Sequence, residues 1–97
     1  MIDYIEINIA NNNYLIDVHK KIIQTNVKEK AISQEAIDNF LRIIRNWDKK
    51  YFDNKIIDGE KFKIIISYNG KKEIIEGLGG YPSNYHELKT FLVMYDD

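Results

Sequence analysis

The sequence predicts an α+β domain in the order ββαββα, with four antiparallel strands in one sheet and two helices packed on one face. Three observations support this prediction. Apolar and polar side chains alternate over residues 3–10, as they do in half-buried strands, and residues 62–68 place Phe62, Ile64, Ile66 and Tyr68 on one face of a further strand. Apolar side chains recur at three- and four-residue steps over residues 33–51 and 84–95, which is helical spacing. Asn69-Gly70 marks a tight turn between two apolar runs.

The first third of the chain predicts a hairpin. Residues 3–10 alternate strictly, and the three asparagines at 11–13 tolerate the positive φ angles that tight turns need. Residues 14–19 resume the alternation and are rich in side chains that favour strands. A helix capped by Asn13 is the alternative, because apolar residues in 14–22 also fit helical spacing. We favour the strand.

The middle third predicts a loop and a long helix. Residues 24–32 are polar and show no periodicity, so we expect a loop there. Ser33 is a good N-cap, and apolar residues follow at helical spacing as far as Tyr51. Asp38 and Arg42 form an i,i+4 pair in the favourable order, with the acid before the base.

The last third predicts a second hairpin whose register the turn determines. Asp58-Gly59 is a turn signal before the third strand. Asn69-Gly70 predicts a type I′ turn, which requires positive φ at both central residues. A two-residue loop there pairs Tyr68 with Lys71, Ile66 with Glu73, Ile65 with Ile74, Ile64 with Ile75 and Lys63 with Glu76. The opposite charges of Lys63 and Glu76 support this register.

A glycine-rich link leads from the second hairpin to the last helix. Gly77, Gly79 and Gly80 let the chain leave the sheet. Asn84 is the expected N-cap, and Glu87 three residues later gives an arrangement like a capping box.

Composition limits the class of protein. The 97 residues are most simply one domain, 1–97. The net charge is −1, whereas proteins that bind phosphate backbones usually carry a basic excess, so we do not expect a nucleic acid partner. The absence of cysteine excludes disulfides and thiolate chemistry and suits the reducing cytoplasm, where we expect the protein. The N-terminus lacks the features of a signal peptide, and no apolar run approaches the roughly 18 residues of a membrane span.

No set of side chains predicts catalysis. On a strand, Asp17 and His19 would share a face, where they could act as a general base with its orienting carboxylate or as metal ligands. We favour an exposed polar pair beside Lys20-Lys21. His86 falls in the first turn of the last helix, where we expect a surface role. The sequence has no zinc motif and no serine in a nucleophile elbow, so we expect no enzymatic activity, no metal and no cofactor.

The glycine-rich link is one candidate binding site. Backbone amides of Gly79 and Gly80, with Tyr81 beside them, could bind an anion before the helix. This pattern predicts a small-ligand or nucleotide-binding protein. The spacings of the known phosphate loops are missing, and Pro82 removes one backbone donor, so we favour a flexible link.

The strand face opposite the helices is the candidate site that we favour. If the helices cover Ile64, Ile66 and Ile75, the second hairpin presents on its other face Lys63, Ile65, Ser67, Lys72, Ile74 and Glu76. The first hairpin would add Tyr4, Glu6, Asn8, Asp17 and His19. Ile65 and Ile74 then form an apolar centre within a charged rim, which is typical of protein interfaces. Tyr81 and Tyr85, before and at the start of the last helix, are further candidate contacts. An ordinary exposed cross-strand pair is the plain alternative.

Residues 36–92 resemble a group of small, mostly uncharacterised single-domain proteins of low-GC bacteria. The resemblance is carried by Trp47-Asp48-Lys49-Lys50-Tyr51, Ile57-Asp58-Gly59-Glu60-Lys61-Phe62, Asn69-Gly70-Lys71 and Gly80-Tyr81-Pro82-Ser83-Asn84-Tyr85. It implies a ββαββα domain and transfers no catalytic residue. The chain is also rich in Ile, Lys, Asn and Tyr, whose codons are A/T-rich, which indicates a low-GC bacterium or one of its phages or mobile elements.

These features together predict a non-catalytic protein-binding module. Many phage-encoded inhibitors, anti-CRISPR proteins among them, resemble this chain in size, charge balance and lack of catalytic motifs. We therefore expect an inhibitor or adaptor that acts on a bacterial protein. The alternatives are the small-ligand binder described above and a homodimer formed through the open sheet.

Overall fold

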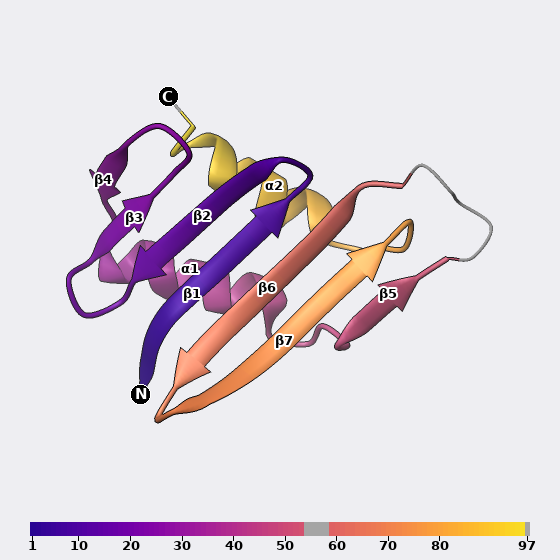
Figure 1. The fold of residues 1–97 in the computed structure, drawn as a ribbon, viewed down its shortest axis with the longest axis horizontal. Coiled ribbons are helices and arrows are strands. Elements are labelled where there is room, and N and C mark those ends of the chain that lie inside the picture. Colours follow the sequence, from indigo (N-terminus) through magenta and orange to yellow (C-terminus); the bar gives the residue numbers. More distant parts are fainter. Residues whose placement is uncertain (54–58, 97) are drawn as a thin grey trace.

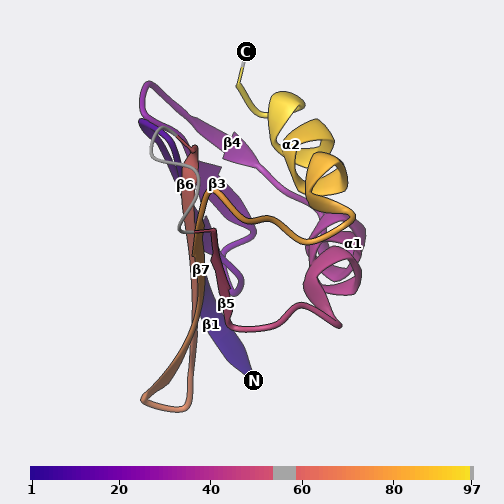
Figure 2. The same cartoon turned by 90° about the vertical axis from the view of Figure 1, so that its right-hand side faces the viewer.

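One mixed sheet carries both helices on the same face, in a computed structural model that describes residues 1–53 and 59–96 (Figures 1 and 2). The strands of the described residues are β1 (Ile2–Ile9), β2 (Asn12–Asp17), β3 (Ile22–Gln24), β4 (Glu29–Ala31), β5 (Lys50–Phe52), β6 (Lys61–Tyr68) and β7 (Lys71–Leu78). The helices are α1 (Gln34–Ile44) and α2 (Tyr85–Val93). Across the sheet the order is β4-β3-β2-β1-β6-β7-β5. The predicted α+β class is confirmed, whereas the four-stranded, wholly antiparallel sheet is wrong, because seven strands form it and β5 runs parallel to β7.

The second hairpin has the predicted register. Asn69 and Gly70 have φ angles of 50° and 77°, as a type I′ turn requires. Ile65 lies opposite Ile74, and all the other predicted pairs occur. The turn signal at Asp58-Gly59 falls partly on residue 58, which lies outside the described residues.

The first hairpin is also confirmed, and residues 14–17 form a strand. Its turn comes earlier than predicted, because Ala10 takes the positive φ of 52° and β2 already begins at Asn12. The two hairpins are joined by pairing between β1 and β6, which places Ile5 opposite Ile66 and Ile7 opposite Ile64. β1 is therefore a central strand of the sheet (Figure 1).

The loop predicted over residues 24–32 is wrong. β3 and β4 form a third hairpin there, and its turn is held by a 2.7 Å hydrogen bond from the Thr25 amide to the Lys28 carbonyl. Three residues are too few for an alternating pattern to show. β4 is moreover an edge strand, where charged side chains such as Glu29 and Lys30 are common because they discourage pairing with other chains.

Helix α1 begins as predicted and ends earlier. The Ser33 hydroxyl accepts a 3.1 Å hydrogen bond from the Ala36 amide, which confirms the N-cap. The helix ends at Ile44, although helical spacing continues to Tyr51. Trp47 follows the helix in a loop, and Tyr51 lies in β5, yet both pack against the core. The helical spacing of apolar residues extends past the helix because these two aromatic side chains pack on the core from a segment that is not helical.

The predicted ion pair within α1 is wrong. Asp38 accepts a 2.9 Å hydrogen bond from the Gln34 amide group. Arg42 turns to Asn39 and lies 3.6 Å from a Glu87 carboxylate oxygen on α2. Exposed i,i+4 pairs contribute only a few tenths of a kcal/mol, so such alternatives compete easily.

The core lies between the sheet and the two helices. Every second residue of β1 and β6 points into it, and Phe40 of α1 meets Phe91 of α2 with ring centroids 5.7 Å apart. Side chains that are less than 2% exposed include Ile5, Ile7, Ile16, Ile23, Ile37, Phe40, Ile64 and Leu88. Neither helix in the described part of the chain has the length and apolarity needed to cross a membrane.

Candidate functional site

The sheet face opposite the helices carries no covering element among residues 1–53 and 59–96 (Figure 2). We call it the open face. Strand registers arrange its side chains in rows that run across the sheet. The middle row consists of Glu29, Gln24, Leu15, Glu6, Ile65 and Ile74. The row on one side consists of Ala31, Ile22, Asp17, Tyr4, Ser67 and Lys72, and the row on the other side of Asn13, Asn8, Lys63, Glu76 and Lys50.

The predicted strand residues come together on this face. The six residues from the second hairpin lie on β6 and β7, and pairing of β1 with β6 sets Tyr4 beside Ser67, Glu6 beside Ile65 and Asn8 beside Lys63. His19 is the exception, because β2 ends at Asp17.

Apolar side chains gather near the middle of the open face. Ile74 is 41% exposed and Tyr4 is 46% exposed, while Ile65 and Leu15 are half-buried on either side of Glu6. Sequence reasoning did not include Leu15 among the site residues, although the alternation in residues 14–19 already placed it with Asp17.

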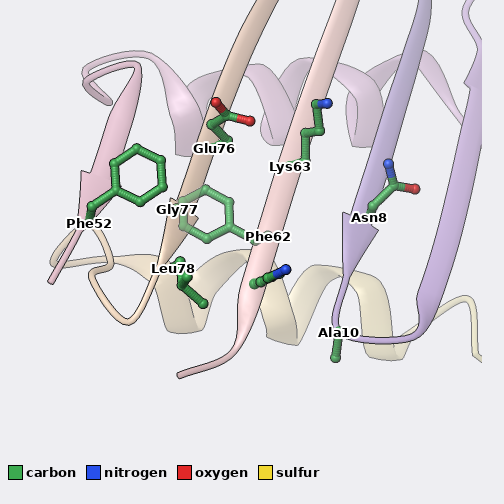
Figure 3. A pocket seen from close by; sticks show the side chains of 9 residues that line it. Asn8, Ala10, Phe52, Phe62, Lys63, Glu76, Gly77 and Leu78 are labelled. Carbon is green, nitrogen blue, oxygen red and sulfur yellow. The ribbon is translucent and has the colours of Figure 1, made fainter. Parts of the chain in front are cut away.

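A shallow depression lies at the end of the open face near β5 (Figure 3). It has a volume of about 440 Å³, and its lining includes Asn8, Phe52, Lys61, Lys63, Glu76 and Leu78. Phe52 is 55% exposed, so an aromatic ring is available beside two lysines and a glutamate. Sequence reasoning missed Phe52, because the pattern extended the helix to the residue before it.

Tyr81 and Tyr85 lie on the helix side of the sheet, away from the open face. The Tyr85 ring packs 5.1 Å from that of Phe62, a core residue, and stacks 4.7 Å from that of Tyr81. Glu60 joins both tyrosines, since its carboxylate accepts a 2.6 Å hydrogen bond from Tyr85 and its carbonyl a 2.8 Å bond from Tyr81. Burial and this carboxylate raise the pKa of Tyr85. Tyr85 is thus a core residue, whereas Tyr81 remains 38% exposed.

The glycine-rich link has a packing role. A Cβ atom on Gly77 would lie 2.4 Å from the Phe62 ring and 2.8 Å from the Tyr51 carbonyl oxygen. A Cβ atom on Gly80 would lie 3.1 Å from the Tyr51 backbone, and Gly79 has a φ of 75°. Gly77 lies within β7 and not after it, contrary to the prediction, and together the three glycines allow the end of β7 and the link to approach β5 closely, which accounts for them without a ligand.

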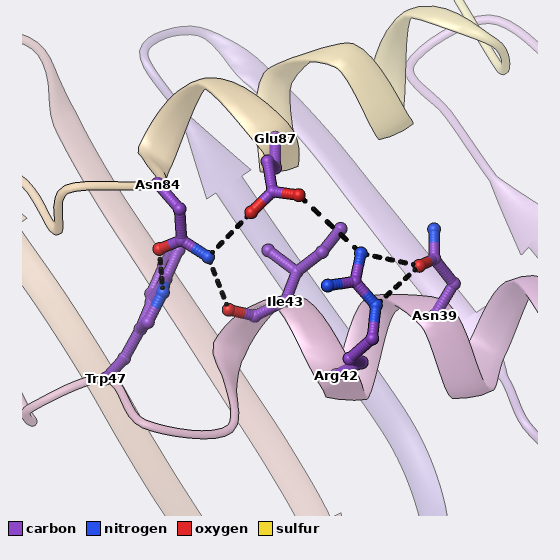
Figure 4. A network of polar contacts seen from close by, with 6 residues as sticks. All are labelled: Asn39, Arg42, Ile43, Trp47, Asn84 and Glu87. Carbon is purple, nitrogen blue, oxygen red and sulfur yellow. Dashed lines mark hydrogen bonds and ion pairs between the residues drawn. The ribbon is translucent and has the colours of Figure 1, made fainter.

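Asn84 ties the end of α1 to the start of α2 (Figure 4). It is the N-cap residue as predicted, but its side chain makes no capping hydrogen bond. Its Oδ1 atom accepts a 2.7 Å bond from the Trp47 indole, and its Nδ2 atom donates to the Ile43 carbonyl at 2.9 Å and to Glu87 at 3.0 Å. The hydrogen bond from Asn84, with help from Arg42, lowers the pKa of Glu87.

We expect Asn84→Ala to lower the free energy of unfolding by about 1–3 kcal/mol, because it leaves the Trp47 indole N–H and the Ile43 carbonyl without this partner. Urea denaturation measures the loss. In the same variant, the pKa of Glu87 should rise toward its ordinary value, which NMR titration measures. Ser83→Ala, at the exposed neighbouring position, should change stability by less than about 0.5 kcal/mol. Equal effects of the two substitutions would contradict this role of Asn84.

The histidines are not part of a metal-binding cluster in the described residues. Asp17 accepts hydrogen bonds from the backbone amides of His19 and Lys20 at 3.1 and 3.0 Å and so shapes the turn after β2. The Nε2 atom of His19 lies 2.7 Å from Oδ1 of Asp3. Within residues 1–53 and 59–96, no three His, Cys, Asp or Glu side chains are grouped to hold a metal ion. His86 is exposed on α2.

We expect His19→Gln to raise the pKa of Asp3, which is lowered chiefly by the hydrogen bond with His19. A carboxyl group whose pKa is lower in the folded state than in the unfolded state stabilises the fold at pH values above its unfolded-state pKa. This stabilisation is lost as the pH falls through its folded-state pKa. The substitution should therefore flatten the stability profile in the acidic range. NMR titration of the Asp3 carboxyl carbon measures the shift. His86→Gln is the matched control, and a similar change in that variant would refute the contact.

Comparison of the chain with protein-family models, with curated proteins and with solved structures gave no significant match.

Proposed function

We propose that this chain is a non-catalytic protein-binding module that contacts its partner through the open face. The observation that carries the proposal is the apolar centre formed by the exposed Ile74 and Tyr4 and the half-buried Ile65, on a sheet face that neither helix of the described residues covers (Figure 2). Charged side chains of both signs surround it, including Lys63, Glu76 and Lys72. An apolar centre with a polar rim is the usual anatomy of a specific protein interface.

The same features support an inhibitor or adaptor that acts on a bacterial protein, of the anti-CRISPR or another anti-defence type. Such a protein needs one complementary surface and no chemistry of its own. A rigid sheet offers this surface at low entropic cost, because its side chains are held in register before binding. The abundance of Ile, Lys, Asn and Tyr, whose codons are A/T-rich, supports an origin in a low-GC bacterium or in a phage or mobile element of one.

We expect Ile65→Asp to weaken partner binding about tenfold or more, since it places a carboxylate in the apolar centre, where central contacts dominate binding energy. Affinity purification from the source cells with tagged protein, quantified by mass spectrometry, measures the retained partner. The fold should persist, because Ile65 lies on the open face and is only half-buried.

Thr90→Asp is the matched control, because it introduces the same carboxylate at an exposed position of α2, on the other side of the sheet. It should retain the partner. Circular dichroism should show the same secondary structure for both variants. Normal partner recovery with folded Ile65→Asp would refute the open face as the binding surface.

A small-ligand or nucleotide-binding function through Gly79, Gly80 and Tyr81 is the second hypothesis. It is supported by a depression of about 580 Å³ beside the link, whose lining includes Arg42, Arg45, Tyr51, Tyr81 and Ser83. Two guanidinium groups there suit an anionic ligand. A thermal-shift screen with ATP, GTP and inorganic phosphate tests it, because a ligand that binds the folded state raises the melting temperature. No shift with any of them would remove nucleotides and phosphate as ligands.

A further inference from the structure

We infer that a second copy of the chain covers the open face in solution, in a two-fold dimer whose axis runs along the strands between β6 and β7. This inference rests on the proposed function because it uses the same open face. It adds which molecule covers that face before another protein binds. It follows from strand register, charge and the geometry of packed sheets.

A two-fold axis in this place lays each strand of the central hairpin over the other strand of the second copy. β6 of one copy lies over β7 of the second copy. Each residue of β6 then faces, in the second copy, the same β7 residue that it pairs with in its own sheet. Ile65 therefore faces Ile74 of the second copy, and the reverse contact occurs by symmetry. The two pairs of Ile65 and Ile74 become the centre of the interface.

Charge complementarity follows from the same register. Lys63 lies opposite Glu76 within the sheet, so across the dimer each lysine faces a glutamate of the other copy and two ion pairs form. In the row on the other side of the isoleucines, Ser67 faces Lys72, so no like charges lie directly opposite each other. A self-complementary patch of this kind is what a two-fold interface requires.

The flanking strands also fit this arrangement. β1 and β5 exchange places under the same axis, so Asn8 faces Lys50 of the second copy. Glu6 lies in the neighbouring row, with Ile65 and Ile74. β5 does not reach this row, because it pairs only with Glu76–Leu78 of β7, so no strand of the second copy faces Glu6. The Glu6 carboxylate therefore projects past the sheet edge toward solvent and is not buried against apolar side chains.

The twist of the sheets does not prevent these contacts. Two sheets pack about 10 Å apart, with their strands within about 30° of each other. Neighbouring rows on one face are two residues, or about 6.6 Å, apart. A rotation of this size about the interface centre displaces the row of Lys63 and Glu76 by only a few ångströms, which long side chains span.

Charge reversal tests the dimer. Lys63→Glu and Glu76→Lys each place like charges at both ion-pair positions, and each should weaken self-association about tenfold or more. The Lys63→Glu variant carries glutamate at positions 63 and 76, and the Glu76→Lys variant carries lysine at both. An equimolar mixture of the two should associate again, as a mixed dimer. Within each variant chain, residues 63 and 76 still carry like charges after mixing. If a variant failed because it did not fold, mixing would therefore not restore association, whereas mixing does restore a complementary interface.

Sedimentation equilibrium over a concentration series provides the readout. The wild-type protein should approach twice the 11.5 kDa of one chain, each variant alone should stay closer to one chain, and the mixture should move back toward the dimer mass. A wild-type mass of one chain at every concentration would overturn the inference, and so would a folded mixture that associates no better than its components. The wild-type series decides the matter even if a variant fails to fold.

The outcome is separable from that of the proposed function. A monomeric wild-type protein whose partner capture depends on Ile65 overturns the dimer and leaves the binding module intact. A dimer that Ile65→Asp dissociates, in a protein that captures no partner, supports the dimer and removes the proposed function.

Discussion

Phe62→Ala should lower the free energy of unfolding by about 3–5 kcal/mol, the range for removing a buried phenylalanine ring. Phe62 is 2% exposed, and it lies at the centre of an aromatic cluster on the helix side of the sheet. Its ring centroid lies 5.1 Å from that of Tyr85, 5.9 Å from that of Trp47 and 6.1 Å from that of Tyr51. The substitution thus opens a cavity where β6, β5 and the start of α2 meet.

Urea denaturation followed by Trp47 fluorescence measures this loss, and the emission also reports on the cluster because Trp47 is the single tryptophan. Phe52→Ala is the matched control, since it removes the same ring from a position that is 55% exposed. It should cost less than about 1 kcal/mol, as substitutions of exposed residues usually do. Equal losses at the two positions would contradict the burial of Phe62.

We expect Gly77→Ala to lower the free energy of unfolding by about 3 kcal/mol, at the upper end of the range for overpacked cores. The added Cβ would lie 2.4 Å from the Phe62 ring, 2.8 Å from the Tyr51 carbonyl oxygen and 2.9 Å from the Gly80 carbonyl oxygen. Two of these three atoms belong to the backbone, so rotating a side chain cannot relieve the contacts. The substitution should push β5 away from β7.

Hydrogen exchange identifies where this change acts. The Glu76 amide donates a 2.9 Å hydrogen bond to the Lys49 carbonyl, and its protection should fall in Gly77→Ala more than that of amides in β1. Gly70→Ala is the control, because a Cβ there meets no atom within 4 Å and only the positive φ of 77° opposes it. That variant should lose about 1–2 kcal/mol and keep the protection at Glu76. Loss of protection in both variants would show a global effect.

The residues of the candidate site that lie on the second hairpin could be predicted from a single turn. Asn69-Gly70 indicates its own backbone conformation, and a two-residue loop then leaves one register for the strands on either side. This register sorted Ile64 to the core and Ile65 to the open face, as the structure has them. Tyr85 could not be sorted in this way, because its role depends on Glu60 and Phe62, which come from another part of the chain.

The sequence alone determined the turn at Asn69-Gly70, the N-cap at Ser33 and the longer strands, since each rests on contacts between residues a few positions apart. Only the tertiary structure decided that Trp47 and Tyr51 lie outside the helix, that β5 forms an edge of the sheet parallel to β7, and that β1 pairs with β6 to join the two hairpins. Nothing local specifies such pairings. Which distant segments meet depends on how the whole chain buries its apolar side chains and satisfies its backbone hydrogen bonds together.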